Sequence, residues 1–337
     1  MANFYEKWQG FWDESNEEKR KSRQVIHEEE LEWIETEQDF KTALMAAPEN
    51  GFRTWGTEAI ISIIPVGAHT GKHEHGEEAI FVCEGEGFSV VNDMKYEWGP
   101  GSVIWIPFGG KHQHFNSGQV PVKYFSVMSL HLEHFVGLGK LDQLEPKGYM
   151  DYRIEAPLSA DGLDPMGRRI VLKQEDAPYD ELGGEGDGGG AIPETPATPE
   201  EVDWDNPDGG GHGGHRDWSR MYMDRQGKNG FKNRELELSN TMGDNPGRHG
   251  GKHAHMEAML YIVDGEGYTI VDGVKVPWHK GSLLHVQGPQ TPHQHFATGD
   301  KPTVQLRFAP GIRTSFFQSL AKERFPYLWF EGRGDGA

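Results

Sequence analysis

The sequence predicts an all-β protein made of two similar barrels, and two observations carry this prediction. First, residues 69–88 and 249–268 are nearly the same stretch, with His253 standing 180 positions after His73. Second, short runs rich in β-branched and aromatic residues alternate with Gly, Pro and Asn-Asp turns and show no helical period. A duplicated module of short strands is expected to close into a barrel or double sheet, because closure removes exposed strand edges.

The 337 residues divide into five segments, which we describe in chain order. We expect a charged helical arm over residues 1–50, a first barrel over 51–150, an acidic Gly- and Pro-rich linker or lid over 151–240, a second barrel over 241–315, and a C-terminal helix and tail over 316–337. The arm is expected to pack on the first barrel or on a partner subunit. A linker of this length is uncommon, so part of it could serve as a lid.

Composition restricts the classes of function. The chain has 33 Lys and Arg against 53 Asp and Glu, a formal net charge of −20, which argues against sequence-independent binding of nucleic acid through its phosphates. The single cysteine, Cys83, excludes an intrachain disulfide and fits a reducing compartment. No apolar run approaches the roughly 18 residues of a membrane helix, and the N-terminus is charged rather than signal-like. We therefore expect a cytoplasmic protein that acts on a small molecule.

Each copy of the repeat carries two histidine clusters. His73 and His75 form a His-x-His pair, and alternate residues of a strand face the same way, about 7 Å apart, so both should point into the barrel. A second cluster begins at His112. The same pattern recurs in the second copy, at His253, His255 and His293. One such pair could be two hydrogen-bonded polar residues on a wet strand face, but its repetition at a fixed internal period favours metal binding.

Three further residues are candidates for the chemistry of the site. His69 shares the inward parity of the pair and could line the mouth of the barrel or act on a proton. His114 faces the same way as His112, and we favour a role in the wall or in orienting a ligand over direct ligation. Arg53 could bind a substrate carboxylate through two hydrogen bonds, although a surface ion pair is the plainer interpretation.

These residues resemble the motifs of the cupins. The first cupin motif is matched by Gly67, His73, His75, Glu78 and Gly85. The second is matched by Gly101, Pro107, Gly109, His112 and Asn116. The resemblance covers about residues 55–127 and 247–307. It implies a bicupin, with two barrels of the jelly-roll or double-stranded β-helix type.

The resemblance also implies a metal at the His-x-His pair and the later histidine of one or both barrels. In the first barrel it implies His73, His75 and His112, with Glu78 as a fourth ligand. In the second it implies His253, His255 and His293. There Ala258 takes the place of the glutamate, one residue is inserted before the later histidine, and Ala297 stands where the motif has Asn. We favour the first barrel as the catalytic one and retain the second as a second active site.

Within the cupins, the chain looks most like the bicupin ring-cleaving dioxygenases of the gentisate and 1-hydroxy-2-naphthoate type. The runs AIFVCEGEG and AMLYIVDGEG and the two HQHF clusters carry this likeness. It implies Fe(II) as the metal, dioxygen as co-substrate, and a phenolic or aromatic carboxylate as substrate. We also expect a homo-oligomer.

Two other classes of function stay open at this point. A bicupin decarboxylase or isomerase would use Mn(II) and a glutamate that shuttles a proton. A non-catalytic binding or sensing cupin would need only the pocket, but such proteins usually carry a fused DNA-binding domain, and the sequence suggests none.

Overall fold

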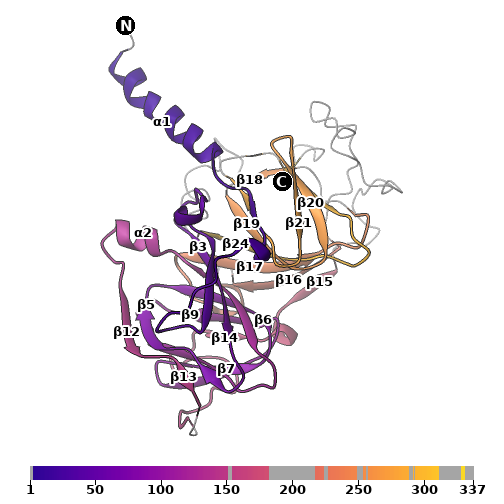
Figure 1. The fold of residues 1–337 in the computed structure, drawn as a ribbon. Coiled ribbons are helices and arrows are strands. Elements are labelled where there is room, and N and C mark those ends of the chain that lie inside the picture. The colour runs from indigo at the N-terminus through magenta and orange to yellow at the C-terminus, as the bar shows by residue number, and fades with distance from the viewer. Residues whose placement is uncertain are drawn as a thin grey trace.

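The protein was analysed as a computed structural model that describes residues 3–150, 154–181, 217–223, 227–248, 253–255, 257–287, 291, 293–310 and 328–330. Strands dominate this part of the chain, and the expected all-β class is confirmed. The two halves of the chain form two strand-rich bodies that lie against each other, the first indigo to magenta and the second orange (Figure 1).

The first barrel is built from two sheets. One contains β14 (Val171–Leu172), β9 (Val103–Ile106), β6 (Glu78–Glu84), β11 (Val122–Met128), β3 (Glu58–Ile64) and β2 (Lys41–Ala46), in that order. The other contains β12 (Leu141–Glu145), β5 (Lys72–His75), β10 (His112–Asn116), β4 (Ala68–His69) and β13 (Gly148–Tyr149), with β7 (Gly87–Val91) between β10 and β8 (Met94–Trp98). All pairings of these strands are antiparallel.

The second barrel repeats this plan. Its larger sheet contains β1 (Val25–Ile26), β22 (Leu283–Val286), β19 (Ala258–Asp264), β24 (Val304–Pro310), β17 (Leu236–Gly243), β16 (Trp218–Met223) and β15 (Tyr179–Glu181). Its smaller sheet contains β21 (Val274–His279), β20 (Glu266–Val271), β23 (His293–Ala297), β18 (His253–His255) and β25 (Leu328–Phe330).

Helical structure is sparse. α1 (Phe4–Arg20) begins at a capping box between Asn3 and Glu6 and extends away from the barrels (Figure 1). α2 (Leu130–Phe135) follows the last long strand of the first barrel. Short 3₁₀ turns are η1 (Glu28–Glu30), η2 (Pro48–Asn50), η3 (Gln174–Asp176) and η4 (Lys228–Gly230). Among the described helices, none combines the length and apolar character needed to cross a membrane.

The repeated Gly-Glu-Gly turns have a steric cause. Gly85 and Gly265 have φ values of 82° and 83°, which only glycine adopts without strain. A Cβ on Gly85 would lie 2.8 Å from the Pro121 carbonyl oxygen, and one on Gly265 would lie 2.7 Å from Thr303 Cα. The two turns therefore conserve the same backbone path in both barrels.

The expected helical arm is present only in part. Beyond α1, residues 25–50 form strands and 3₁₀ turns instead of a helix. β1 pairs with β22 of the second barrel, and β2 pairs with β3 of the first. In the first turns of the helix, Phe4, Tyr5 and Trp8 are exposed, while near its C-terminal end the Lys19 ammonium lies 5.5 Å from the centroid of the Trp55 ring. The arm is long enough to reach both sheets, and backbone pairing with those sheets outweighs the helical propensity of its charged residues.

The expected linker also contributes to the barrels. Within residues 151–240, β14 pairs with β9 of the first barrel, while β16 and most of β17 belong to the larger sheet of the second. Strands of the second barrel's larger sheet thus occur already at Tyr179–Glu181 and Trp218–Met223, ahead of residue 241. Residues 182–216, the most Gly-rich part, lie outside the described residues, as does most of the expected C-terminal helix. Within the expected C-terminal helix and tail, only residues 328–330 are described, and they form β25, a strand paired with β18.

A buried aromatic cluster joins the two barrels. The Phe125 ring of β11 stacks on Tyr261 of β19, with centroids 4.6 Å apart, and packs at 5.0 Å on Phe308 of β24. All three side chains are buried. The hydrophobic core is therefore continuous across the junction, and the two barrels stabilise each other.

Two buried glutamates connect the barrels reciprocally. Glu77 of the first barrel accepts hydrogen bonds from the backbone N–H groups of residues 234–236, at 2.7 to 3.3 Å. Glu257 of the second barrel accepts the N–H of Trp55, at 3.0 and 3.1 Å. Positions 77 and 257, like positions 55 and 235, are 180 residues apart, so the internal repeat relates the two contacts. We call this pair of contacts the reciprocal clamp.

Glu133 is a third buried carboxyl group beside the reciprocal clamp, and it should make stability depend on pH. Glu133 accepts the N–H of Glu77 at 3.1 Å, and burial, followed by a hydrogen bond with Glu235, raises the pKa of Glu133 to about 8. The folded protein therefore binds a proton that the unfolded chain releases at lower pH, and stability should fall as pH rises from about 4.5 to about 8.

The variant Glu133→Gln cannot lose this proton. Its melting temperature should decline less between about pH 5 and about pH 8 than that of the unmodified protein. The matched control is Glu49→Gln, at an exposed glutamate that pairs with His131. An unchanged pH slope in Glu133→Gln would contradict the prediction.

Candidate metal centre

The first barrel brings three histidines together from two neighbouring strands. In β5 the burial alternates along Lys72–His75, so His73 and His75 both face inward, as the His-x-His spacing predicts. In β10, His112 lies directly opposite His73 in the antiparallel register. The three ring centroids lie 4.0 to 5.0 Å from one another.

Backbone carbonyls fix the orientation of all three rings. The Nδ1 atoms of His73 and His75 lie 3.0 Å from the carbonyl oxygens of Gly71 and Gly76, and Nδ1 of His112 lies 2.7 Å from that of Gly110. Each Nδ1 therefore donates its proton to a carbonyl, which leaves the Nε2 lone pair directed at the shared space. Hydrogen bonding of this kind to the second ring nitrogen is typical of histidines that bind metals.

Glu78 completes the cluster. Its Oε2 lies 3.5 Å from His75 Nε2 and 3.4 Å from His112 Nε2, while its Oε1 accepts the Ser126 hydroxyl. Both Glu78 Oε2 and His112 Nε2 are buried without a hydrogen-bond partner among the described residues. Buried polar atoms rarely stay unpaired. One nitrogen from each of His73, His75 and His112 lies within 4.8 Å of the others, and one donor atom from each of Glu78, His112 and His114 forms a second such group. Donor atoms of this chemistry fit a divalent transition metal.

The charges of the cluster also suit a cation. Burial, with the neighbouring rings of His112 and His75, lowers the pKa of His73 to about 2. Burial acts to raise the pKa of Glu78, but the adjacent rings of His112 and His75 outweigh it and hold the pKa well below its usual range. At neutral pH Glu78 is thus an anion and His73 is unprotonated, and these are the forms that bind metal. For His75, burial acts to lower the pKa, but the adjacent Glu78 carboxylate outweighs it and raises the pKa, so a metal competes with a proton at His75.

A cavity of about 360 Å³ opens onto this centre. One part of its wall is apolar, formed by Ile34, Ala43, Leu44, Ile60, Met128, Leu130 and Leu141. The polar part is formed by Thr36, Glu37, Gln38, Asp39, Thr42, His73, His75, Glu78, His114, Tyr124 and Gln143. No arginine or lysine lines the cavity among the described residues. An anionic substrate would therefore depend on the metal for its compensating charge.

Two residues of the arm were missed by sequence reasoning. Gln38 Nε2 lies 2.7 Å from His73 Nε2, and because His73 Nδ1 carries the proton, the amide donates. The buried Asp39 accepts a hydrogen bond from the Tyr124 hydroxyl at 3.1 Å. No motif marks either residue, since they reach the site only because the arm folds over the first barrel.

Gln38 should compete with a metal for His73. The Gln38 amide donates a hydrogen bond to His73 Nε2, the nitrogen that would bind a metal. Such a hydrogen bond contributes about 0.5–1.5 kcal/mol. The variant Gln38→Ala should therefore bind Fe(II) or Mn(II) about 2- to 10-fold more tightly in anaerobic titrations. Gln143→Ala is the matched control, because that amide lines the same cavity but donates to the backbone at Glu145. Equal affinities of both variants and the unmodified protein would contradict the competition.

The three catalytic candidates are placed differently. His114 lies in the wall, with Nδ1 2.7 Å from Ser89 Oγ, and burial lowers its pKa to about 3. His69 Nδ1 lies 2.9 Å from the carbonyl oxygen of the adjacent Thr70, and His69 does not line the cavity. Arg53 is exposed beside Glu18 and is also absent from the cavity wall, because the chain at this point runs over the outer surface. The position of Arg53 beside Glu18 suits the surface ion pair, and its contact with a substrate carboxylate stays an untested prediction.

The second barrel repeats the surroundings of this centre. His293 Nδ1 lies 2.9 Å from the Thr291 carbonyl, as His112 does from Gly110. His295 bonds through Nδ1 to Thr269 Oγ1 at 2.8 Å, as His114 does to Ser89. The side chains of His253 and His255 lie outside the described residues, although β18 places their backbone beside His293.

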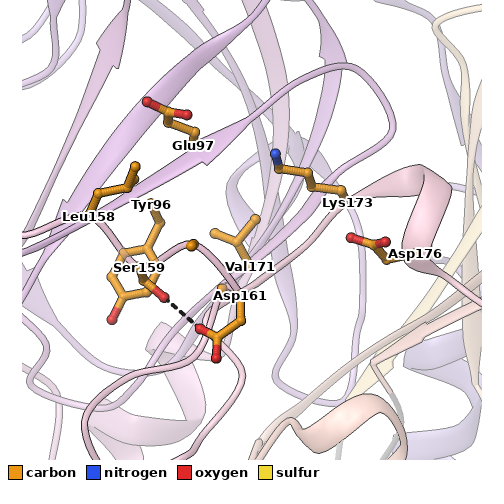
Figure 2. A pocket seen from close by; sticks show the side chains of 10 residues that line it. Tyr96, Glu97, Leu158, Ser159, Asp161, Val171, Lys173 and Asp176 are labelled. Atoms are coloured by element: carbon orange, nitrogen blue, oxygen red, sulfur yellow. Dashed lines mark hydrogen bonds between the residues drawn. The ribbon is translucent and has the colours of Figure 1, made fainter.

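Another cavity, of about 100 Å³, is lined by residues of β8, of β14 and of the segment 158–162 (Figure 2). Tyr96, Leu158, Val171 and Lys173 line it, and Ser159 Oγ donates to Asp161 at 3.1 Å. It contains no histidine and no set of donors suited to a metal. The histidine centre remains the better candidate for chemistry.

Comparison with known proteins identifies the family. The sequence model of the cupin domain matches residues 60–128 and 240–307, one match in each barrel. The chain thus contains two cupin domains, the arrangement called a bicupin. A curated relative of the bicupin, an uncharacterized protein from Methanocaldococcus jannaschii, is 38% identical over 64 residues. That alignment covers 18% of the bicupin and 51% of the relative, so it spans about half of the relative's length.

Solved structures show the same fold. A mutant of salicylate 1,2-dioxygenase from Pseudoaminobacter salicylatoxidans, in complex with gentisate, superposes with a TM-score of 0.61 at 14% identity, over 97% of the bicupin and 94% of that chain. A mutant of oxalate decarboxylase from Bacillus subtilis superposes with a TM-score of 0.56 at 12% identity, over 86% and 77%. At these identities the likeness concerns the fold alone.

Proposed function

We propose that this bicupin is a non-haem Fe(II) dioxygenase that cleaves the ring of a hydroxylated aromatic acid at the first-barrel centre. The observation that carries the proposal is the cavity, which combines an apolar wall suited to an aromatic ring with a cluster of metal donors at one end. The fold likeness to a dioxygenase that was solved with gentisate supports it.

In this proposal His73, His75, His112 and Glu78 would hold the metal. A bound Fe(II) would supply the positive charge that attracts the substrate's carboxylate and the redox chemistry of dioxygen. The apolar wall would orient the ring and exclude water. Gln38 and Gln143, whose side chains line the cavity, are placed to hydrogen-bond the polar substituents of the substrate.

Asp39 is proposed to handle the proton of the substrate's hydroxyl group. Burial raises its pKa to about 6, so this carboxyl can both accept and return a proton near neutral pH. Turnover should then rise with pH through about 6, and Asp39→Asn should lose this limb of the pH profile while keeping its metal. The variant Asp39→Glu should restore part of the limb. An unshifted profile in Asp39→Asn would remove Asp39 from the mechanism.

The test is an oxygen-uptake assay on protein that has been purified anaerobically and reconstituted with Fe(II) or with Mn(II). Salicylate, gentisate and hydroxynaphthoates form the substrate panel. Consumption of one O₂ per substrate with Fe(II) is the expected result. Tight binding of these acids without turnover by either metal form would instead indicate a binding protein.

The Mn(II)-dependent decarboxylase remains the second candidate, and Glu78 is the observation that favours it. A carboxylate within 3.5 Å of two of the histidines gives the centre a charged fourth donor, and the fold is also similar to that of an oxalate decarboxylase. Release of CO₂ by the Mn(II) form without oxygen uptake would establish this function and exclude the dioxygenase.

A further inference from the structure

Outside the barrel centres, two histidines and a glutamate meet where the arm joins the second barrel. His27 and Glu29 belong to the arm, at the start of η1 and within it, and His279 ends β21. The pairing of β1 with β22 places the arm beside this strand end. Residues that are 250 or more positions apart in the chain thus share one surface.

The hydrogen bonds of the two rings direct one nitrogen of each toward the glutamate. His279 Nδ1 lies 2.9 Å from the Lys280 carbonyl and therefore carries the proton, so its Nε2 presents a lone pair. Ser282 Oγ accepts the backbone N–H of His279 at 3.0 Å and also lies 2.8 Å from His27 Nδ1. In both rings Nδ1 thus has a hydrogen-bond partner and Nε2 is left as the possible ligand. The rings stack 4.7 Å apart at 15°, so one of them must turn before a single ion can lie in the plane of both.

The remaining donor atoms suit a cation. His279 Nε2 lies 3.0 Å from Glu29 Oε1, and one donor from each of the three residues lies within 4.8 Å of the others. A lone pair that faces a carboxylate oxygen is repelled unless a proton or a cation lies between them. Bonds of about 2.0–2.1 Å to a tetrahedral zinc ion place neighbouring donors roughly 3.3 Å apart. The 3.0 Å contact is close to this value, and the other donors, which lie within 4.8 Å, must approach by up to about 1.5 Å.

We propose that His27, Glu29 and His279 form a zinc site that fastens the arm to the second barrel. Two imidazoles and one carboxylate are borderline donors that Zn²⁺ prefers over Ca²⁺ or Mg²⁺, and water would complete its coordination. The exposure of Glu29 and His279, at 63% and 43%, lets the ion enter from solvent and leaves room for these shifts. This site is separate from the centre in the first barrel.

Fastening the arm at this point affects the rest of its path. The strand β1 contributes only two residue pairs to the second barrel, Val25 with Leu284 and Ile26 with Leu283. Further along the same arm, Gln38 and Asp39 close the cavity of the first barrel. A zinc ion beside β1 would therefore reduce fraying of the segment that precedes this closure.

The test measures Zn²⁺ binding by equilibrium dialysis in a full-length His75→Ala/His112→Ala background, which lacks the first-barrel centre. Adding His279→Ala or His27→Ala should remove one equivalent of Zn²⁺ and lower the zinc-induced rise in melting temperature. Adding His131→Ala is the matched control, because this half-exposed histidine pairs with Glu49 and Glu58. Replacement of Zn²⁺ by Co²⁺ should give tetrahedral absorption bands that His279→Ala loses.

A result that overturns the site is an unchanged Zn²⁺ stoichiometry in both His27→Ala and His279→Ala, or an equal loss in His131→Ala. Circular dichroism checks that each variant folds. Glu29→Gln, at an exposed position, provides a conservative variant and should weaken binding about 10-fold or more without changing the fold. Because the background lacks the first-barrel centre, failure of this site and failure of the proposed dioxygenase are independent results.

Discussion

Replacing His112 with alanine is expected to remove the metal of the first barrel and to reduce turnover to background. His112 contributes an unpaired buried Nε2 to the centre, 3.4 Å from Glu78 Oε2, and its ring is the closest neighbour of His73. Loss of even an outer hydrogen-bond partner of a metal ligand commonly costs 10- to 100-fold in affinity or activity, and loss of a ligand should cost more. Elemental analysis and oxygen uptake on the same preparation measure both effects.

Two companion variants complete this experiment. His69→Ala is the matched control within the same barrel, because His69 does not line the cavity, and it should retain the metal. His293→Ala tests the second barrel. Turnover that survives His112→Ala and disappears with His293→Ala would move the active site to the second barrel.

Replacing Phe125 with alanine is expected to cause the largest loss of stability. Phe125 has no exposed surface, and its ring contacts Tyr261 and Phe308 of the other barrel. Truncation of a buried phenylalanine typically costs about 3–5 kcal/mol, because it removes apolar burial and leaves a cavity. Since the ring belongs to the core that both barrels share, both should unfold at lower denaturant concentration.

Denaturant unfolding, monitored by tryptophan fluorescence and by circular dichroism, measures this loss. Phe108→Ala is the matched control, because Phe108 is 49% exposed, and it should change stability by no more than about 0.5 kcal/mol. A Phe125→Ala protein as stable as this control would show that the barrels do not depend on their junction.

The sequence predicts the parts of the molecule that local pattern determines. The internal repeat and the period-two alternation identified both barrels and the inward direction of His73 and His75. Counting from the turn glycine located Glu78, which the structure places beside His75 and His112. These predictions succeed because strand geometry and turn sterics act over a few residues.

The contributions of the arm and the linker depend on long-range pairing that no local pattern reveals. Gln38 and Asp39 read as ordinary polar residues of a charged segment, and only the pairing of β2 with β3 carries them to the cavity. Arg53 was chosen for its charge alone, and the path of the chain leaves it on the outer surface. Pairing between distant strands reflects the whole fold, so the composition of each segment could not predict it.

The reciprocal clamp bears on how the molecule arose and on how it can be divided. Glu77 of the first barrel contacts the second barrel, and the equivalent Glu257 of the second barrel contacts the first. Such a pair of equivalent contacts is typical of a two-fold interface between identical subunits. Fusion of two such copies into one chain would preserve both contacts. A fragment that holds a single barrel would then expose a buried carboxylate and an apolar face, and we expect it to recover its fold by pairing with itself.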